Sequence, residues 1–382
     1  MNLKLTAIAT ATSLLQIACG GGQAAIDTTP PTVTITDNTP AQIATGSVTF
    51  SFDLSEDVGS SLTAEDILVT GGSAGALTRI SAKSYTLVVM PTANTTGIIH
   101  VSVPVAKFTD TTGNANTVAS SASQSFNTVA PIAGWTLAWS DEFSVNGSPD
   151  SNKWSYDTER NKLGWFNNEK QYYSANRLEN ASVQNGMLTI TARKESLTTA
   201  ADYGGQAYTS ARLITRGKAS WTYGFVEVRA KLPCSLGTWP AIWMLGTGGI
   251  WPDDGEIDIM EQKGTAAIEK TRVSGTIHTK GYNYFGGAAG VGQGASTTVA
   301  DACTNFHNYQ LTWSVDKIVM GVDGSNYFEF INLKDGDTTK WPFNNPQFII
   351  LNLAVGGDLG GAVPTNFAAD QMVVDYVRVY QR

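Results

Sequence analysis

The chain has 382 residues, of which 42% are hydrophobic, so it can bury a sizeable core and favours two domains over one. Acidic residues outnumber basic ones by 33 to 25, which gives a formal net charge of -8. With no sustained Lys/Arg run, this balance excludes a nucleic-acid backbone as the expected partner and favours a neutral or weakly charged substrate.

Residues 1–26 are predicted to be an export signal followed by a tether. Lys4 precedes an apolar stretch that ends near Ile17, as in a secretory signal, and the stretch is too short to cross a membrane. Cys19 is followed by three glycines and resembles the processing site of bacterial lipoproteins, although Gln16 departs from that pattern. We expect an exported protein, lipidated at Cys19 as an outer-membrane or cell-surface lipoprotein, or otherwise secreted.

Residues 27–129 are predicted to form a small β-sandwich. Val48 to Leu54 alternate between apolar and polar residues, as in a half-buried strand. Similar short runs follow at regular spacing, at Val33 to Ile35, Ile67 to Thr70, Tyr85 to Val89 and Ile98 to Val103. The segments D-T-T-P-P-T-V-T-I-T and D-T-T-G-N-A-N resemble bacterial immunoglobulin-like modules. Almost no aromatics and no acid or His cluster occur here, which favours a spacer or surface-docking role.

A second β-rich region is predicted over residues 133–382. Phe225 to Leu232 alternate as expected for a half-buried antiparallel strand. The segment G-T-W-P-A-I-W-M-L then places Trp239 and Trp243 on one face of a strand. Two tryptophans at this spacing could stack against two sugar rings, or they could be core aromatics.

The most informative segment, Trp251 to Glu261, reads W-P-D-D-G-E-I-D-I-M-E. Strict strand alternation would place Glu261 on the isoleucine face, opposite Glu256 and Asp258, and would bury an unpaired carboxylate at high cost. One extra residue, a β-bulge around Met260, returns Glu261 to the other acids, and bulges are common where an active site re-aims a side chain. We therefore predict three acids on one face of a strand.

Three acids at this spacing match the needs of a glycosidase. With the bulge, the backbones of Glu256 and Glu261 are roughly 13 Å apart, and inclined side chains shorten this gap. A retaining glycosidase places its two carboxyls about 5 Å apart. Crowding also disfavours full ionisation, so at least one acid should keep its proton near neutral pH and act as a general acid. The alternatives are an acidic strand edge or a calcium loop.

A histidine is predicted to face the same site. In V-S-G-T-I-H-T-K, residues 273–280, His278 shares a face with Ser274 and Thr276, and a hairpin after Glu261 would lay this strand beside the acids. His278 could then orient an acid or contact the sugar; the alternative is a lone surface histidine. No His-Glu-x-x-His or paired Cys-x-x-Cys pattern occurs, so zinc is unsupported and catalysis is left to the carboxylates.

Two cysteines lie in the second region. Export would place Cys234 and Cys303 in an oxidising compartment. They could form a disulfide or remain reduced and buried, because sequence gives no distance between them.

From about Trp135 to Arg382 the chain resembles glycoside hydrolase family 16 and, within it, the laminarinases, which are endo-β-1,3-glucanases. The resemblance implies an all-β chain whose C-terminal β-jelly-roll sandwich has a concave substrate cleft, preceded by the small Ig-like β-sandwich. Its landmarks, in chain order, are W-S-D-E-F, N-N-E-K-Q-Y-Y, Y-G-F-V-E-V-R-A-K-L-P, G-T-W-P-A-I-W-M-L, W-P-D-D-G-E-I-D-I-M-E, W-P-F, N-L-A-V-G-G and V-D-Y-V-R-V-Y.

The resemblance also implies roles for individual residues. Glu256 matches the nucleophile, Asp258 the assisting acid and Glu261 the general acid/base, and the extra residue of the bulge is typical of the laminarinase branch. No cofactor is expected for catalysis. Substrate contacts are implied for Asn168, Arg212, Trp239, Trp243, Trp251 and His278.

A structural calcium ion on the convex side is a further feature that the resemblance implies. Asp375 occupies the position of the carboxylate ligand, and Glu142 and the Gly186 carbonyl are candidate co-ligands. We expect Asp375 to face the valines of V-V-D-Y-V-R-V, where an uncompensated acid would be costly, so it needs a cation or a salt bridge.

The expected function is hydrolysis of β-1,3-glucan by a retaining endo-glycosidase. Alternatives are a mixed-linkage β-glucanase, a hydrolase of marine galactans such as agar or carrageenan, and a non-catalytic β-glucan-binding protein. The presence of both Glu256 and Glu261 argues against a non-catalytic binding protein. The absence of a basic cluster for sulfate esters argues against a galactan hydrolase. The sequence leaves the oligomeric state open.

Overall fold

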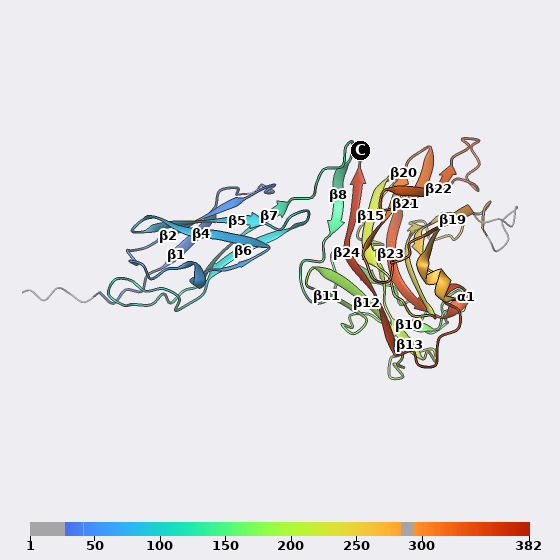
Figure 1. Cartoon of the computed structure of the whole chain (residues 1–382), viewed down its shortest axis with the longest axis horizontal. Coiled ribbons are helices and arrows are strands. Elements are labelled where there is room, and N and C mark those ends of the chain that lie inside the picture. Colours follow the sequence, from blue (N-terminus) through green and yellow to red (C-terminus); the bar gives the residue numbers. More distant parts are fainter. Residues whose placement is uncertain (1–26, 41, 284–292) are drawn as a thin grey trace, which may run out of the picture.

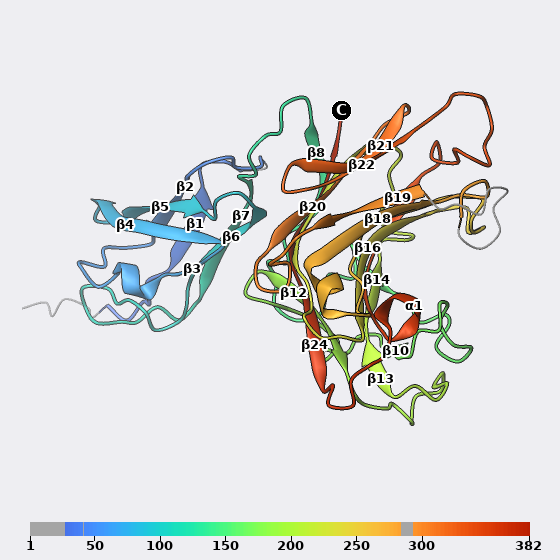
Figure 2. The same ribbon diagram turned by 45° about the vertical axis from the view of Figure 1, so that its right-hand side comes forward.

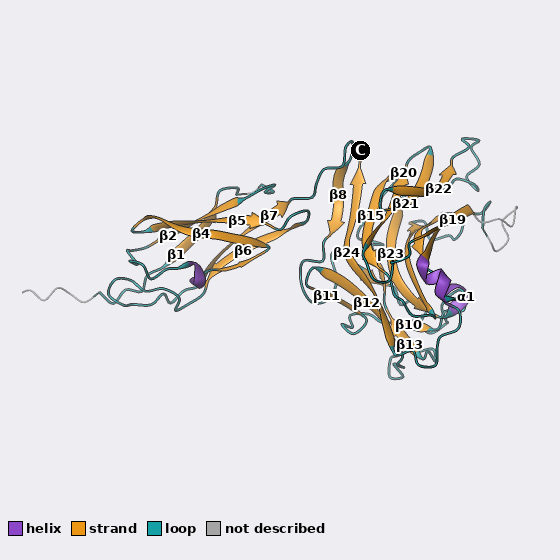
Figure 3. Cartoon of the chain, in the orientation of Figure 1, coloured by secondary structure: helices purple, strands orange, loops and turns teal. Residues whose placement is uncertain are grey.

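The computed structural model describes residues 27–40, 42–283 and 293–382 and contains two β-sandwiches in succession (Figure 1). Strands dominate, and the few helical turns are short (Figure 3). The predicted export signal and Cys19 lie outside the described residues. Within the described ranges, we find no helix with the length and apolar character needed to cross a membrane.

The first sandwich packs a four-stranded sheet against a three-stranded one. The four-stranded sheet has the order β1-β2-β5-β4 and the smaller one the order β3-β6-β7. Alternation in β2 buries Phe50 and Phe52 completely between the sheets, so the predicted strand and its inward face are confirmed. The elements are β1 (Val33–Asp37), β2 (Val48–Leu54), η1 (Ala64–Asp66), β3 (Leu68–Thr70), β4 (Gly72–Ser81), β5 (Ser84–Pro91), β6 (Thr96–Val103) and β7 (Ser120–Asn127).

The second sandwich consists of a ten-stranded and a seven-stranded sheet. The larger sheet has the order β10-β13-β12-β24-β15-β20-β21-β22, with β11 beside β12 and β8 beside β24. Its strands are β8 (Thr136–Asp141), β10 (Gln171–Tyr173), β11 (Ala181–Gln184), β12 (Met187–Arg193), β13 (Tyr208–Ser210), β15 (Gly224–Lys231), β20 (His307–Trp313), β21 (Lys317–Val322), β22 (Ser325–Ile331) and β24 (Ala369–Gln381).

The seven-stranded sheet has the order β19-β18-β17-β16-β23-β14-β9. Figure 2 shows β16, β18 and β19 on the side of this sandwich that lies away from the first one. The elements are β9 (Ser155–Tyr156), β14 (Arg212–Ile214), β16 (Thr238–Gly246), β17 (Glu256–Glu261), η2 (Ala267–Thr271), β18 (Arg272–His278), β19 (Gln293–Thr298), β23 (Gln347–Val355) and α1 (Gly357–Gly360).

One apolar core joins these two sheets. Val226 and Val228 of β15 point inward from the larger sheet, and Ile257, Ile259 and Met260 of β17 point inward from the smaller one. These five side chains are at most 2% exposed. Burial of their apolar area holds β17 against the core, and its polar side chains are left on the outer face of the seven-stranded sheet.

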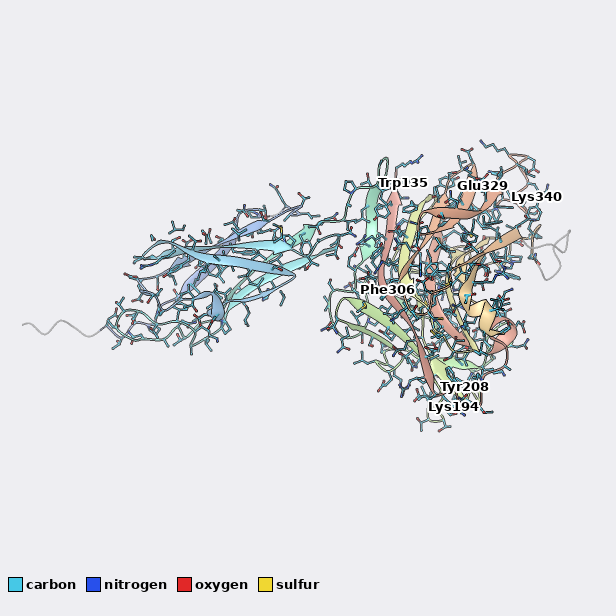
Figure 4. The ribbon with its side chains drawn as sticks, in the orientation of Figure 1. Trp135, Lys194, Tyr208, Phe306, Glu329 and Lys340 are labelled. Atoms are coloured by element: carbon cyan, nitrogen blue, oxygen red, sulfur yellow. The ribbon has the colours of Figure 1, made fainter. Side chains whose placement is uncertain are left out.

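The two sandwiches meet at the edge formed by β8 and β24. Arg378 of β24 donates from Nε and Nη2 to both carboxylate oxygens of Glu142, each at 2.9 Å, and its Nη2 also reaches the Asn94 carbonyl of the first sandwich. Thr95 Oγ1 donates to the same carboxylate at 3.2 Å. Trp135, labelled in Figure 4, follows the linker between the sandwiches and packs against Phe225, with ring centroids 6.0 Å apart.

Candidate active site

A β-bulge interrupts β17 where the sequence predicts one. On the β18 side, Asp258 is opposite Thr276 and Glu261 is opposite Ser274, so three steps along β17 match two along β18. On the β16 side the register also shifts, between Ile242 and Trp243. The extra residue lies at Ile259–Met260, and the bulge prediction is confirmed. As a result, Glu261 leaves the apolar face.

A glycine opposite the bulge makes room for it. Gly275 of β18 lies where β17 carries its extra residue, and a Cβ there would come within 2.2 Å of Met320 Sδ and 2.7 Å of the Tyr327 hydroxyl oxygen. The Tyr327 hydroxyl donates to the Ile259 carbonyl at 3.4 Å. The bulged backbone is therefore packed from behind by the larger sheet.

The three acids line one open cleft on the outer face of the seven-stranded sheet. The cleft encloses about 550 Å³, and the described residues that line it all belong to the second sandwich. Strand alternation and the bulge together bring the acids to the same wall. The lining residues are Asn167, Glu169, Trp239, Ala241, Trp243, Glu256, Asp258, Glu261, Lys263, Ser274, Thr276, His278, Gly294, Ala295, Ser296, Asn352, Asp358 and Leu359.

Burial and mutual repulsion raise the pKa values of two of these acids. Burial is the main cause of the raised pKa of Asp258, which lies well above its ordinary value, and the charges of Glu256 and Glu261 add to it. Burial, followed by the charge of Glu256, raises the pKa of Glu261 to about 7, although His278, the Trp239 indole and Lys263 act in the opposite direction. Near neutral pH a large fraction of Glu261 therefore keeps its proton, and the environment of Asp258 disfavours its ionised form.

Each acid has one aromatic or imidazole partner. Trp239 Nε1 donates to Glu261 Oε1 at 3.0 Å, and Trp251 Nε1 donates to Glu256 Oε2. His278, directly opposite Glu256 across the strand pair, places Nε2 3.3 Å from Asp258 Oδ2. These contacts help to orient the three carboxyl groups along the cleft wall.

The structure separates the predicted sugar-contact residues into two groups. Trp239, Trp243 and His278 line the cleft, whereas Trp251 lies beside it and is 48% exposed. Trp239 is only 7% exposed, so its ring is mostly packed and its polar edge faces Glu261.

Arg212 and Asn168 lie next to the cleft and are not among its described lining residues, and sugar contact stays a prediction for both. The Arg212 guanidinium is 4.6 Å from the centre of the Trp243 ring, and its Nε is 2.9 Å from Asp157 Oδ2. Arg212 is directly opposite Asn352, which lines the cleft, so its side chain lies on the cleft face of the sheet and packs against Trp243. Asn168 Nδ2 donates to Asp358 Oδ1 at 2.7 Å, and its neighbours Asn167 and Glu169 face the cleft in its place.

Comparison with known proteins agrees with this architecture. Residues 168–378 match the family model described as glycosyl hydrolases family 16, and residues 27–128 match the model of a bacterial Ig-like domain. The chain belongs to glycosyl hydrolase family 16. Its predicted fold, an all-β family 16 jelly roll after an Ig-like sandwich, is confirmed.

The relatives of this family 16 chain include named glucanases. A β-glucanase of Rhodothermus marinus is 48% identical over 259 residues, which span 65% of this chain and 85% of the relative. A glucan endo-1,3-β-glucosidase A1 of Niallia circulans is 39% identical over 65% of this chain but only 38% of its own length.

Solved structures of the family superpose on the second sandwich. A non-specific endo-β-1,3(4)-glucanase, crystallised with an oligosaccharide in its active site, is 51% identical and has a TM-score of 0.62, with 66% of this chain and 97% of that one covered. The laminarinase from Rhodothermus marinus is 48% identical and has a TM-score of 0.59, with 66% and 99% covered.

Sequence reasoning missed several residues of the family 16 cleft. Glu169 stands in N-N-E-K-Q-Y-Y, and Asn352 interrupts the apolar run I-I-L-N-L-A-V of β23. A polar residue within an otherwise apolar strand was the available signal for Asn352. Lys263 follows Glu261 by two residues and had no distinguishing pattern.

The predicted calcium ligands of the family 16 domain lie together, but the two carboxylates among them already have cationic partners. Glu142, Gly186 and Asp375 line one cavity at the junction of the two sandwiches. Arg378 engages both oxygens of Glu142, and Arg229 Nη1 is 2.5 Å from Asp375 Oδ2. Asp375 is 35% exposed, so the expectation that it lies among valines is wrong. Two guanidinium groups leave this donor set a poor fit for a divalent cation, and calcium stays a prediction.

The two cysteines of the family 16 domain lie side by side as free thiols. Cys234 Sγ is 3.5 Å from the Cys303 carbonyl oxygen. Burial, with the neighbouring Cys234, raises the pKa of Cys303 to about 12, so this thiol is a poor nucleophile.

Proposed function

We propose that this family 16 enzyme hydrolyses internal β-1,3 linkages of a laminarin-type β-glucan with retention of configuration. The observation that carries the proposal is the bulge in β17, which places Glu256, Asp258 and Glu261 on one wall of an open cleft. An open cleft accepts the middle of a polysaccharide chain, as an endo-acting enzyme requires. Relatives named as β-glucanase and laminarinase, at 48% identity, support the same substrate class.

In the first step, Glu256 attacks the anomeric carbon while Glu261 gives its proton to the departing 3-oxygen. A carbon–oxygen bond to Glu256 forms as the glycosidic bond breaks, and the product is a glycosyl ester. Glu261 suits this role because its pKa of about 7 keeps much of it protonated at neutral pH. In the second step, Glu261 takes a proton from water, and the resulting hydroxyl displaces Glu256 from the sugar.

Asp258 is proposed to assist Glu256 through a shared proton. One carboxylate oxygen of Glu256, one of Asp258 and one ring nitrogen of His278 all lie within 4.8 Å of one another. Asp258 also forms a hydrogen bond with Glu256. The raised pKa of Asp258 favours its protonated form, which donates to the Glu256 carboxylate and spares the site a third negative charge. His278 and the Trp251 indole hold the two carboxyl groups in place.

The stereochemical outcome tests this mechanism directly. Two successive displacements at one carbon give net retention, so the first product of laminarin hydrolysis should be the β-anomer. Proton NMR within the first minutes, before mutarotation, would follow the anomeric signal. An α-anomer appearing first would show that water attacks directly and that Glu256 is not the nucleophile.

A panel of four polysaccharides separates the candidate functions. We expect the highest release of reducing sugar from laminarin, less from the mixed-linkage glucan lichenan, and none from agarose or carrageenan. Lys263 is the one lysine or arginine among the described residues that line the cleft, which suits a neutral chain better than a sulfated one. Preferential cleavage of agarose or carrageenan would overturn the assignment, and binding of laminarin without cleavage would indicate a recognition protein.

The cellular location is part of the proposal. The predicted signal before Cys19 supports export, with lipidation at Cys19 or plain secretion as the two routes. A polysaccharide too large to enter the cell requires its hydrolase outside, so this location agrees with the proposed substrate.

A further inference from the structure

A chain of hydrogen bonds runs beneath one side of the cleft and ends at a carboxylate that the mechanism does not use. Trp243 Nε1 of β16 donates to Asn352 Oδ1 of β23 at 2.7 Å. Asn352 Nδ2 donates to the Tyr173 hydroxyl at 2.9 Å, and this hydroxyl is 3.2 Å from Glu169 Oε2. Tyr173 is fully buried, and Asn352 is 5% exposed.

The direction of this chain follows from the first donor. An indole N–H can only donate, so the Asn352 atom beside it must be the carbonyl oxygen, and the amide nitrogen must face Tyr173. An amide nitrogen also only donates, so the Tyr173 oxygen accepts from it and gives its own proton to Glu169. Every bond points the same way, and Glu169 is the terminal acceptor.

The two carboxylate oxygens of Glu169 differ in the hydrogen bonds that they accept. Gln171 Nε2 also donates to Oε2, at 2.7 Å, so both hydrogen bonds within the protein end on the same oxygen. Among the residues that the structure describes, none donates to Oε1. Glu169 lines the cleft together with Asn352 and Trp243. Glu169 is half-buried in the cleft wall, and burial raises its pKa against the opposing charge of Arg212.

We propose that Oε1 of Glu169 accepts a hydrogen bond from a free hydroxyl of a sugar unit bound on the β16 and β23 side of the cleft. Glu169 is then a specificity-determining residue, because a partly desolvated acceptor pairs with a hydroxyl but not with an O-substituted sugar. Sites built to hydrogen-bond one hydroxyl discriminate strongly against analogues that lack it, since the protein group is left unpaired. The identity of the sugar as a glucosyl unit rests on the proposed function.

The test compares Glu169→Gln with the wild type on laminari-oligosaccharides of increasing length. Glutamine keeps the size of the side chain but removes the charge, and we expect KM to rise about tenfold for chains long enough to reach the site. The value of kcat should stay within about twofold, because Glu169 does not touch the reacting acids. Chains too short to reach it should show no difference.

Two further variants control for a merely structural role. Tyr173→Phe leaves Glu169 in place but removes one of its anchors, so KM should rise severalfold in the same length-dependent manner. Tyr172→Phe removes a neighbouring hydroxyl that donates to Asp202 at 2.6 Å, outside the cleft, and should leave KM unchanged. Thermal unfolding of each variant measures any loss of stability separately.

The outcomes distinguish this proposal from the proposed function. An unchanged KM in Glu169→Gln, or a fall in kcat at every chain length, would overturn the role of Glu169 even if laminarin is the substrate. If the wild type instead cleaves another polysaccharide of the panel, the glucan assignment fails, and the same comparison on fragments of that polysaccharide still decides the role of Glu169.

Discussion

Glu256→Ala should fold like the wild type and lose turnover on laminarin by at least about 10⁴-fold, as expected when a covalent nucleophile is removed. The side chain lies at the start of β17 and is only partly buried, and its polar contacts include the Trp251 indole and Asp258. Its loss removes the atom that attacks the sugar and leaves the apolar face of the strand intact. Initial rates of reducing-sugar release and thermal unfolding measure the two effects.

Glu329→Ala is a matched control for Glu256→Ala. Glu329 is also a strand glutamate, on β22, and its carboxylate pairs with Lys317 Nζ at 2.7 Å on the surface (Figure 4). Exposed ion pairs contribute little to stability, so both rate and unfolding temperature should stay close to wild type. Residual activity above about 1% in Glu256→Ala would assign the nucleophile to another residue.

Glu261→Gln should lower kcat/KM on laminarin by roughly 10²- to 10⁴-fold, the usual contribution of a general acid. The same residue should set the alkaline limb of the wild-type pH profile. Its pKa is about 7, and the protonated form is active in the first step, so kcat/KM should fall about tenfold per pH unit above that value. The residual activity of Glu261→Gln should lack this limb.

A substrate that needs no protonation checks the role of Glu261. The phenolate of an aryl glycoside with an acidic phenol departs without protonation. Glu261→Gln should therefore form the glycosyl ester from this substrate at a rate near that of wild type. An equal loss on the aryl glycoside and on laminarin would show that Glu261 has a structural or binding role only.

The substitution Glu261→Gln should lower activity but raise protein stability at alkaline pH. The pKa of Glu261 is raised on folding from 4.5 to about 7, so the folded state prefers the protonated form. Its contribution to stability is therefore complete below pH 4.5 and is lost as pH rises through 7. The unfolding temperature of Glu261→Gln should exceed that of wild type by more at pH 8 than at pH 4.5.

Much of the catalytic strand could be derived from local sequence. The six residues of β17 contain three acids and the apolar residues Ile257, Ile259 and Met260. The acids can share one face of the strand only if one residue is extra, and the structure has a bulge between Asp258 and Glu261. The position of His278 followed from the same alternation in the neighbouring strand. Both conclusions hold because each side chain of a strand points either to the buried face or to the outer face of its sheet.

Local sequence did not determine the surroundings of other residues, which depend on neighbours that are remote in the chain. The surroundings of Arg212 also depended on remote residues, because Asp157 and the Trp243 ring hold its guanidinium beside the cleft, and its contact with substrate stays a prediction. Asp375 was expected among valines, yet the bulge in the pairing of β15 with β24 leaves it partly exposed beside Arg229.

The sequence by itself determined the two β-rich regions, the bulged strand and the acids that share its outer face, because these follow from the period of a strand and the cost of burying a charge. Only the tertiary structure decided which polar groups meet beneath the cleft. Tyr173 and Asn352 are 179 residues apart in the chain and form one hydrogen bond because β23 passes beside the segment that carries Glu169. No local pattern encodes such a pairing, since it depends on the order in which distant strands enter a sheet.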